Sequence, residues 1–184
     1  DDEFQGFPKI GRLDKEWIAT EKIDGTNAQV VVSDDGQRVR AGSRTRWITP
    51  EDDNYGFARW GVEHFDELLN LGPGRHFGEW WGSGCQRGYG LPKGEKRFSL
   101  FNTSRWDDER PACCHVVPTL YTGPMSEEAI TGALNALHLY GSRAAPGFMD
   151  AEGVVIFHTA ANIGFKKTLK KDEMPKSMAT KDQP

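Results

Sequence analysis

Through much of this chain, apolar and polar residues alternate in short stretches with the two-residue period of β-strands. These stretches do not alternate regularly with helical segments, which is typical of α+β domains. We therefore expect an α+β domain with largely antiparallel sheets flanked by helices. A hairpin is expected over 29–43 with its turn at 34–36, and further strands over 76–80, 97–101, 116–121, 153–158 and 164–168.

The clearest helical pattern runs from Glu127 to Tyr140. Ser126 has the side chain of an N-cap, and Gly141 is a typical residue just past a helix end. The apolar positions recur on one face, which we expect to pack against the core. This stripe consists of Ile130, Ala133, Leu134, Leu137 and Tyr140.

Two further helices are expected earlier in the chain. One covers 62–71 and stops at the glycine-rich segment 72–74. The other begins at Thr49, whose side chain can cap a helix that has Pro50 at its first position.

The composition fits a single globular domain of 184 residues with 37% hydrophobic residues. No apolar run is long enough to span a membrane. The segment 172–184 is polar and is expected to be a tail beyond a domain that covers 1–171. Cys85 and the adjacent pair 113–114 lack the spacing of a zinc site, so we expect free thiols in a reducing cytoplasm.

The net charge of −4 argues against broad nucleic-acid binding, but the positive charges are clustered. A local groove for phosphates needs such clusters, although any one of them is also typical of a solvated face. The clusters are Arg38, Arg40, Arg44 and Arg46; Lys93, Lys96 and Arg97; and Lys166, Lys167, Lys170 and Lys171.

Lys22 lies in the segment Glu21-Lys22-Ile23-Asp24-Gly25-Thr26-Asn27, which has the pattern K-x-D-G. A lysine in this setting can attack the α-phosphate of ATP and hold AMP as a phosphoramide. Only the neutral amine attacks, so the site must displace the proton that a lysine carries at neutral pH. The pattern by itself is also typical of a hairpin turn with a solvated lysine.

Further segments follow in a definite order. They are 76–82 with Glu79, the aromatic 97–102, 151–156 with Glu152, and 164–168 with paired lysines. With the Lys22 segment, this series resembles the covalent nucleotidyltransferase superfamily of polynucleotide ligases and mRNA capping enzymes. The resemblance runs from about Phe7 to Lys171. Asn27 replaces the arginine usual in DNA ligases and capping enzymes, and K-x-D-G-T-N resembles the RNA ligase 2 branch, which includes phage ligases.

The resemblance implies a role for each matching residue. Lys22 would accept AMP, Glu79 would bind the ribose hydroxyls, and Phe101 would stack on the adenine, with Phe98 as the alternative. Glu152 would bind a catalytic Mg²⁺ or Mn²⁺. The full set of implied nucleotide-binding residues is Glu21, Asn27, Arg44, Glu79, Phe101 and Lys166.

The basic residues carry the remaining implied roles. Lys166 would contact the α-phosphate during catalysis. The family often shows K-x-K in this last motif, whereas Thr168 occupies the second position here, so either Lys167 or Thr168 would take the second role. Arg44 would contact the nucleotide or the RNA, and Arg46 is the competing candidate for RNA binding.

The expected function is an ATP-dependent RNA ligase whose adenylyltransferase domain covers 1–171. Lys22 would become adenylylated, AMP would move to an RNA 5′-phosphate, and a 3′-hydroxyl would displace it. We expect a monomer in the cytoplasm, which includes that of a phage-infected host. The alternatives are a nick-sealing DNA ligase, a GTP-dependent capping enzyme, and a non-catalytic module that binds nucleotide or RNA ends.

Overall fold

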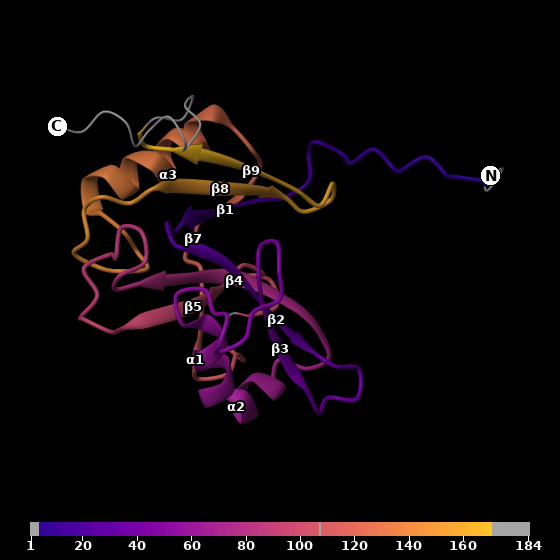
Figure 1. Cartoon of the computed structure of the whole chain (residues 1–184). Helices are drawn as coiled ribbons and strands as arrows, with labels where there is room; N and C mark the ends of the chain where they lie inside the picture. The colour runs from indigo at the N-terminus through magenta and orange to yellow at the C-terminus, as the bar shows by residue number, and fades with distance from the viewer. Residues whose placement is uncertain (1–3, 107, 171–184) are drawn as a thin grey trace.

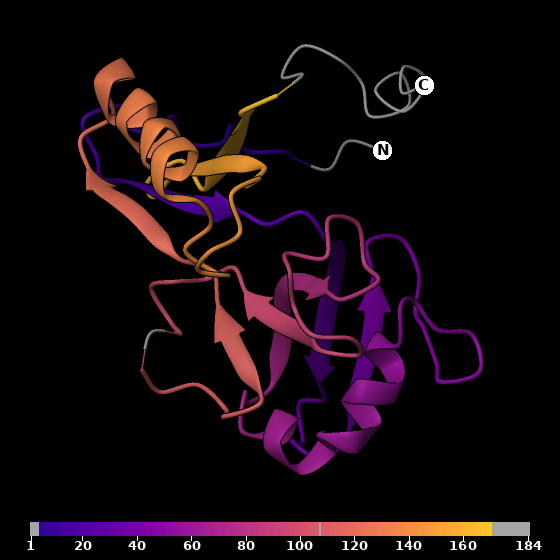
Figure 2. The same cartoon turned by 90° about the vertical axis from the view of Figure 1, so that its left-hand side faces the viewer.

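The computed structural model describes residues 4–106 and 108–170 of the chain. Within these residues, two β-sheets lie between helices at opposite ends of the molecule (Figures 1 and 2). The four-stranded sheet has the order β7 (Thr119–Gly123), β1 (Trp17–Lys22), β8 (Gly153–His158) and β9 (Ile163–Thr168). The five-stranded sheet has the order β3 (Val39–Ser43), β2 (Thr26–Val32), β4 (Gly74–Gly82), β5 (Lys96–Leu100) and β6 (Cys114–Val116).

Helix α3 (Glu127–Tyr140) covers one side of the four-stranded sheet (Figure 2). Its bounds, the Ser126 cap and the end at Gly141 confirm the prediction from sequence. The alternating apolar residues of the sheet pack against the apolar stripe of the helix. This core contains Trp17, Val154 and Ile156 from the strands and Ala133 and Leu137 from α3. The prediction was wrong for Tyr140, which is 79% exposed because it lies in the last turn, beyond the edge of this core.

Helices α1 (Phe57–Glu63) and α2 (Phe65–Leu69) cover the five-stranded sheet. The hairpin prediction is confirmed, since β2 and β3 pair antiparallel across the turn. The prediction of one helix over 62–71 was wrong. The helical region begins earlier and is interrupted at His64, whose ψ of 23° departs from helical geometry.

Thr49 does not begin a helix. Its hydroxyl accepts a hydrogen bond from the backbone N–H of Asp52 at 3.2 Å, and the two backbones also bond to each other. The pattern that predicted a helix cap therefore closes an isolated turn, because Ser and Thr side chains satisfy both motifs in the same way.

The strand expected over 116–121 is also two elements. Val117 and Pro118 separate β6 from β7, and the two strands belong to different sheets. The Val117 N–H still donates to Leu100 O in the five-stranded sheet, while Pro118 O accepts from Glu21 N–H of β1. β6 is also parallel to β5, an exception to the antiparallel pairing.

A third cluster of buried side chains connects the two halves. It comprises Ile23, Trp81, Tyr89, Val117 and Ala145. The α+β architecture with largely antiparallel sheets is confirmed. Among the described residues, no helix has the length and apolar character needed to cross a membrane. The expected tail over 172–184 lies outside the described residues, as does Lys171, so the division into domain and tail stays a prediction.

Candidate active site

Lys22 is the last residue of β1, where the chain leaves the four-stranded sheet and enters the five-stranded one. The turn that follows is held tightly. Tyr89 is buried, and its hydroxyl accepts a hydrogen bond from the Asp24 N–H at 2.7 Å. A β-carbon at Gly25 would collide with the carbonyl oxygen of Trp80. The D-G pair thus lets the chain pass directly against β4 and fixes where Lys22 lies.

The Lys22 ammonium lies against a single carboxylate. Its Nζ is 2.7 Å from Oε2 of Glu152, which precedes β8, and Lys22 pairs with Gly153 in the sheet. The side chain of Lys22 is 19% exposed and that of Glu152 is 6% exposed. The ion pair is therefore largely withdrawn from water but remains open to a ligand at the lysine.

Glu79, in β4, lies close enough to Lys22 and Glu152 for their charges to act on its carboxyl group. It accepts hydrogen bonds from the Gly25 N–H and from Asn27 Nδ2, each at 3.1 Å. Burial raises the pKa of Glu79 to about 7; the hydrogen bond from Gly25 and the charge of Lys22 oppose this, while the charges of Glu152 and Asp24 add to it. Glu79 therefore gains a proton near neutral pH, and cations in the cleft favour its ionised form.

The two phenylalanines of the aromatic segment differ in environment. Phe98 is fully buried in the core under α1 and α2. Phe101 follows β5, is 42% exposed, and donates its N–H to Phe77 O. Strand alternation places Phe101 on the same face as Glu79. Of the two rings, Phe101 is the exposed one, and its stacking on adenine stays a prediction.

Strand register separates the paired lysines of β9. Lys166 pairs with Val155, and Lys167 pairs with Val154. Val154 belongs to the core under α3, whereas Val155 pairs with Thr20 on the face that also carries Lys22. Lys166 therefore shares the face of Lys22, and Lys167 lies on the opposite one. Thr168 is in register with Gly153 and Lys22, so it holds the second position of the motif.

Glu21 and Lys22 likewise point to opposite faces of the sheet. Glu21 is 1% exposed, and its Oε2 accepts hydrogen bonds from the N–H groups of Arg143 at 2.8 Å and Ala144 at 2.9 Å. These bonds tie β1 to the segment after α3. Its Oε1 is buried and has no hydrogen-bond partner among the described residues. One oxygen of Glu21 is thus structural, and the other lacks a donor.

Comparison with known proteins shows to which family the chain belongs. A family model described as RNA ligase matches residues 15–171, which is more than half of the chain. The chain belongs to the RNA ligase family. No curated protein matches it.

Solved RNA ligase structures share the fold. One is a Naegleria gruberi RNA ligase mutant with ATP and Mn, at 17% identity and a TM-score of 0.58, covering 84% of this chain and 50% of that chain. The structure of the Naegleria gruberi ligase with PPi gives 18% identity, a TM-score of 0.59 and coverage of 84% and 50%. The chain therefore spans about half the length of that RNA ligase.

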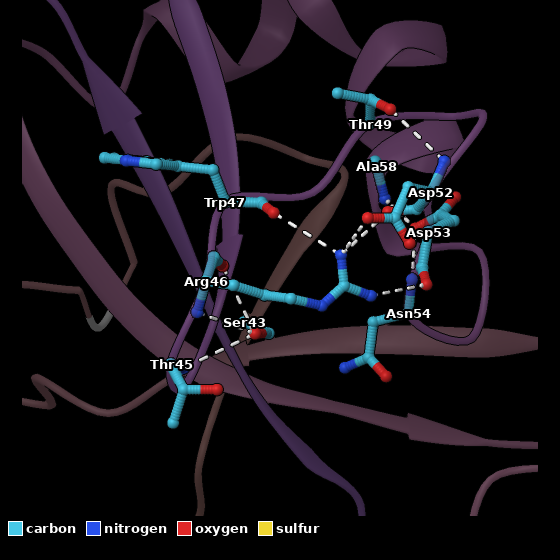
Figure 3. Close-up of polar contacts among 9 residues, drawn as sticks. All are labelled: Ser43, Thr45, Arg46, Trp47, Thr49, Asp52, Asp53, Asn54 and Ala58. Carbon is cyan, nitrogen blue, oxygen red and sulfur yellow. Dashed lines mark hydrogen bonds and ion pairs between the residues drawn. The ribbon is translucent and has the colours of Figure 1, made fainter.

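Among the arginines expected to contact RNA, Arg46 is committed to its own loop (Figure 3). Its guanidinium donates to Asp52 Oδ2 at 2.7 Å, to Asp52 O at 3.1 Å and to Asp53 O at 3.2 Å. These bonds close the loop between β3 and α1. Arg44 is exposed and has no hydrogen bond or ion pair within the described part of the chain. The structure thus favours Arg44 over Arg46 as the residue that can meet a ligand.

A polar group at the rim of the cleft was missed from sequence. Arg87 lies 3.4 Å from Asp24 and 4.0 Å from Asp150, which also binds Lys170 at 2.6 Å. Arg87 follows Cys85 in a glycine-rich loop whose tyrosine, Tyr89, is a core residue. The sequence offered only the glycines as a signal, and the glycines alone could not identify which side chain reaches the K-x-D-G turn.

A second cluster lies away from this cleft. His64, Glu67 and Cys113 place their ligand atoms within 4.8 Å of one another. Glu67 Oε1 lies 3.0 Å from His64 Nδ1, and Oε2 accepts from the Cys113 N–H at 3.0 Å. These contacts account for the grouping, because they join α2 to the segment that leads into β6. Cys85, Cys113 and Cys114 are free thiols, as expected.

Proposed function

We propose that this chain is the adenylyltransferase domain of an ATP-dependent RNA ligase. The observation that carries the proposal is the 2.7 Å contact between Lys22 Nζ and Glu152 Oε2, with the buried Glu79 close enough to feel both charges. Membership of the RNA ligase family supports the same activity. The domain would extend over 1–171.

In the first step, the neutral amine of Lys22 attacks the α-phosphorus of ATP. The Nζ–P bond forms, the bond from that phosphorus to the bridging oxygen breaks, and pyrophosphate leaves. The proton that Lys22 must lose would pass to solvent, since the Lys22 side chain is 19% exposed and Glu152 is assigned to the divalent cation. Lys166, on the same face, would offset the negative charge that develops on the phosphate oxygens.

The nucleotide would lie between residues of the four-stranded sheet and residues of the five-stranded sheet. Phe101 would stack on the adenine, and Glu79 would bind the ribose hydroxyls while Asn27 holds its carboxylate in place. Glu21 lies on the sheet face opposite Lys22, so it would support the adenine site indirectly, through the bonds that tie β1 to Arg143 and Ala144. Arg44 would reach the phosphates or the RNA end.

The carboxylate of Glu152 fits a Mg²⁺ or Mn²⁺ ion. It is nearly buried and already accommodates the positive charge of Lys22. Magnesium is usually held by one or two carboxylates together with substrate phosphates, so a single protein ligand is sufficient. A bound divalent cation supplies positive charge that offsets the charge of the triphosphate.

The remaining steps would transfer AMP to an RNA 5′-phosphate and then release it when a 3′-hydroxyl attacks. In each step the attacking group forms a bond to phosphorus and the leaving group loses its bond to the same phosphorus, with no change of oxidation state. We infer that the chain acts as a monomer and that its compartment is a reducing cytoplasm, with its free cysteines as support.

Joining of RNA ends tests the proposal directly. A 5′-phosphorylated RNA with a free 3′-hydroxyl is incubated with ATP and Mg²⁺, and Lys22→Ala serves as the inactive control. Joined product with ATP but not GTP is expected. Joining of DNA as fast as RNA would favour a DNA ligase, GTP dependence would favour a capping enzyme, and a chain that binds ATP but forms no adenylate would be a binding module.

A further inference from the structure

The five-stranded sheet has one face covered by α1 and α2. On its other face Phe77 and Arg75 are exposed, whereas Trp81 at the end of β4 is buried. On the covered face, Ala28, Val30 and Val32 of β2 are buried. On the other face, the intervening Asn27, Gln29 and Val31 pair with Glu79, Phe77 and Arg75 of β4. Phe77 is 52% exposed, in contrast to the buried residues on the covered face.

The pairing of β2 with β4 carries this second face from Glu79 to Arg75. At one end Asn27 bonds to Glu79, and Phe77 lies beside Phe101 through the bond between their backbones. Two residues further along, Arg75 donates to Gln29 at 3.2 Å. The row from Glu79 to Arg75 extends about 14 Å along β4, since each strand residue advances about 3.4 Å.

The far end of the row carries an aromatic ring surrounded by arginines. The guanidinium of Arg40 lies 3.8 Å from the centre of the Trp47 ring, and that of Arg75 lies 5.6 Å from it. Trp47 remains 37% exposed. Arginine over a tryptophan face is a favourable cation–π arrangement, and it also keeps two positive charges beside an accessible ring.

Arg46 holds this end in place. Its hydrogen bonds to Asp52 and Asp53 close the segment that bears Trp47 (Figure 3). Gln29 adds a second anchor, because its Nε2 donates to Ser43 O at 3.1 Å. The Trp47 ring is therefore presented by a closed loop, and the arginines beside it by β3 and β4.

We propose that this exposed sheet face binds the single-stranded RNA segment next to the reacting end, with bases stacked on Phe77 and Trp47. Arg40, Arg44 and Arg75 contact its phosphates. Aromatic side chains in a positively charged row are the chemistry that holds single-stranded nucleic acid, because every base has a face that can stack. The row begins at Glu79, which lies near Lys22, so an RNA bound on it has its end beside Lys22. This inference rests on the proposed function and specifies its substrate site.

Binding of a fluorescently labelled, 5′-phosphorylated single-stranded RNA in the absence of ATP tests the proposal. Phe77→Ala and Trp47→Ala should each weaken binding about five- to a hundredfold. Arg75→Ala should weaken binding and make it less sensitive to salt. Tyr140→Ala and Arg59→Ala are matched controls, since Tyr140 on α3 and Arg59 on α1 are exposed outside this face. Both controls should bind RNA like the unmodified protein.

Photocrosslinking keeps the test decisive if a variant folds poorly. The unmodified protein is irradiated with an RNA that contains 5-iodouridine near its phosphorylated end, and the attached peptides are mapped. Crosslinks at Phe77 or Trp47 are expected. Crosslinks only outside the row, or unchanged RNA affinity in well-folded Phe77→Ala and Trp47→Ala, would overturn the inference. Lysyl-AMP formation is assayed separately, so a failure of the proposed function would be seen there and not in RNA binding.

Discussion

The ammonium of Lys22 has an ion-pair partner before any substrate binds, because Glu152 lies 2.7 Å from it. Opposite them, Glu79 is a buried carboxylate with a pKa near neutrality. The site thus contains one carboxylate that is ion-paired, Glu152, and another whose charge depends on its surroundings, Glu79. This difference at the residue scale leads to separate predictions for Glu79 and for the lysines.

The pKa of Glu79 predicts how stability depends on pH. Burial raises this pKa from 4.5 to about 7, so the folded protein holds a proton that the unfolded chain releases between those values. The associated stabilisation is present below about pH 4.5 and is lost as pH rises through 7. The free energy of unfolding should therefore fall over this range by roughly 2–3 kcal/mol more in the unmodified protein than in Glu79→Gln. Denaturant titrations at pH 5 and pH 8 measure the free energy of unfolding of both proteins. An equal change between these pH values in the two proteins would contradict the assignment.

The strand register predicts unequal roles for Lys166 and Lys167. Lys166→Ala should lower the rate of lysyl-AMP formation about a hundredfold, in the range for loss of a charge-stabilising group. Lys167→Ala, which removes the same charge from the opposite face, should have a much smaller effect. Single-turnover assays with labelled ATP provide the comparison, and the reverse order would refute the placement.

The order of the motifs along the sequence predicted Lys22, Glu79 and Glu152 as site residues, and the structure places them near one another. It left open whether Lys167 or Thr168 takes the second role of the last motif, because that choice depends on the register of β9 against β8. It also could not show that Arg46 is paired with Asp52, since an arginine can equally close a loop or bind a ligand.

Helix α3 is the element whose sequence signals agree most closely with its structure. Its cap, stripe and terminal glycine are all local signals, and each lies within the helix or next to it. The break at Val117 and Pro118 is different, because it exists only where one strand ends against β5 and the next begins against β1. Such a change of sheet depends on distant strands and leaves only the proline as a local signal.

The cap of α3 can be tested by itself. The Ser126 hydroxyl accepts from the Ala129 N–H at 3.0 Å, so Ser126→Ala should lower the free energy of unfolding by about 1 kcal/mol. Ser126→Asp should retain most of the stability, because aspartate caps equally well. Equilibrium unfolding in urea measures both variants. Equal stability of the alanine and serine proteins would show that the cap contributes nothing.

The whole molecule has a net charge of −4, and its positively charged residues are gathered in a few clusters. RNA binding should therefore depend on a few arginines and be sensitive to salt. If Arg40, Arg44 and Arg75 neutralise three phosphates, the logarithm of RNA affinity should fall with the logarithm of salt concentration with a slope of about −2. Arg44→Ala should reduce this slope by about 0.7. A slope near zero in the unmodified protein would exclude phosphate contacts as the main source of affinity.

The two sheets meet at the position of Lys22, and adenylylation at that residue is the central claim. The most direct measurement incubates the protein with α-labelled ATP and Mg²⁺, without RNA, and maps the labelled peptide. The label should be found on Lys22, should require the divalent cation, and should be absent from Lys22→Ala and from Lys22→Arg, whose guanidinium stays protonated. AMP on Lys166 or Lys167, or full labelling of Lys22→Ala, would contradict the account.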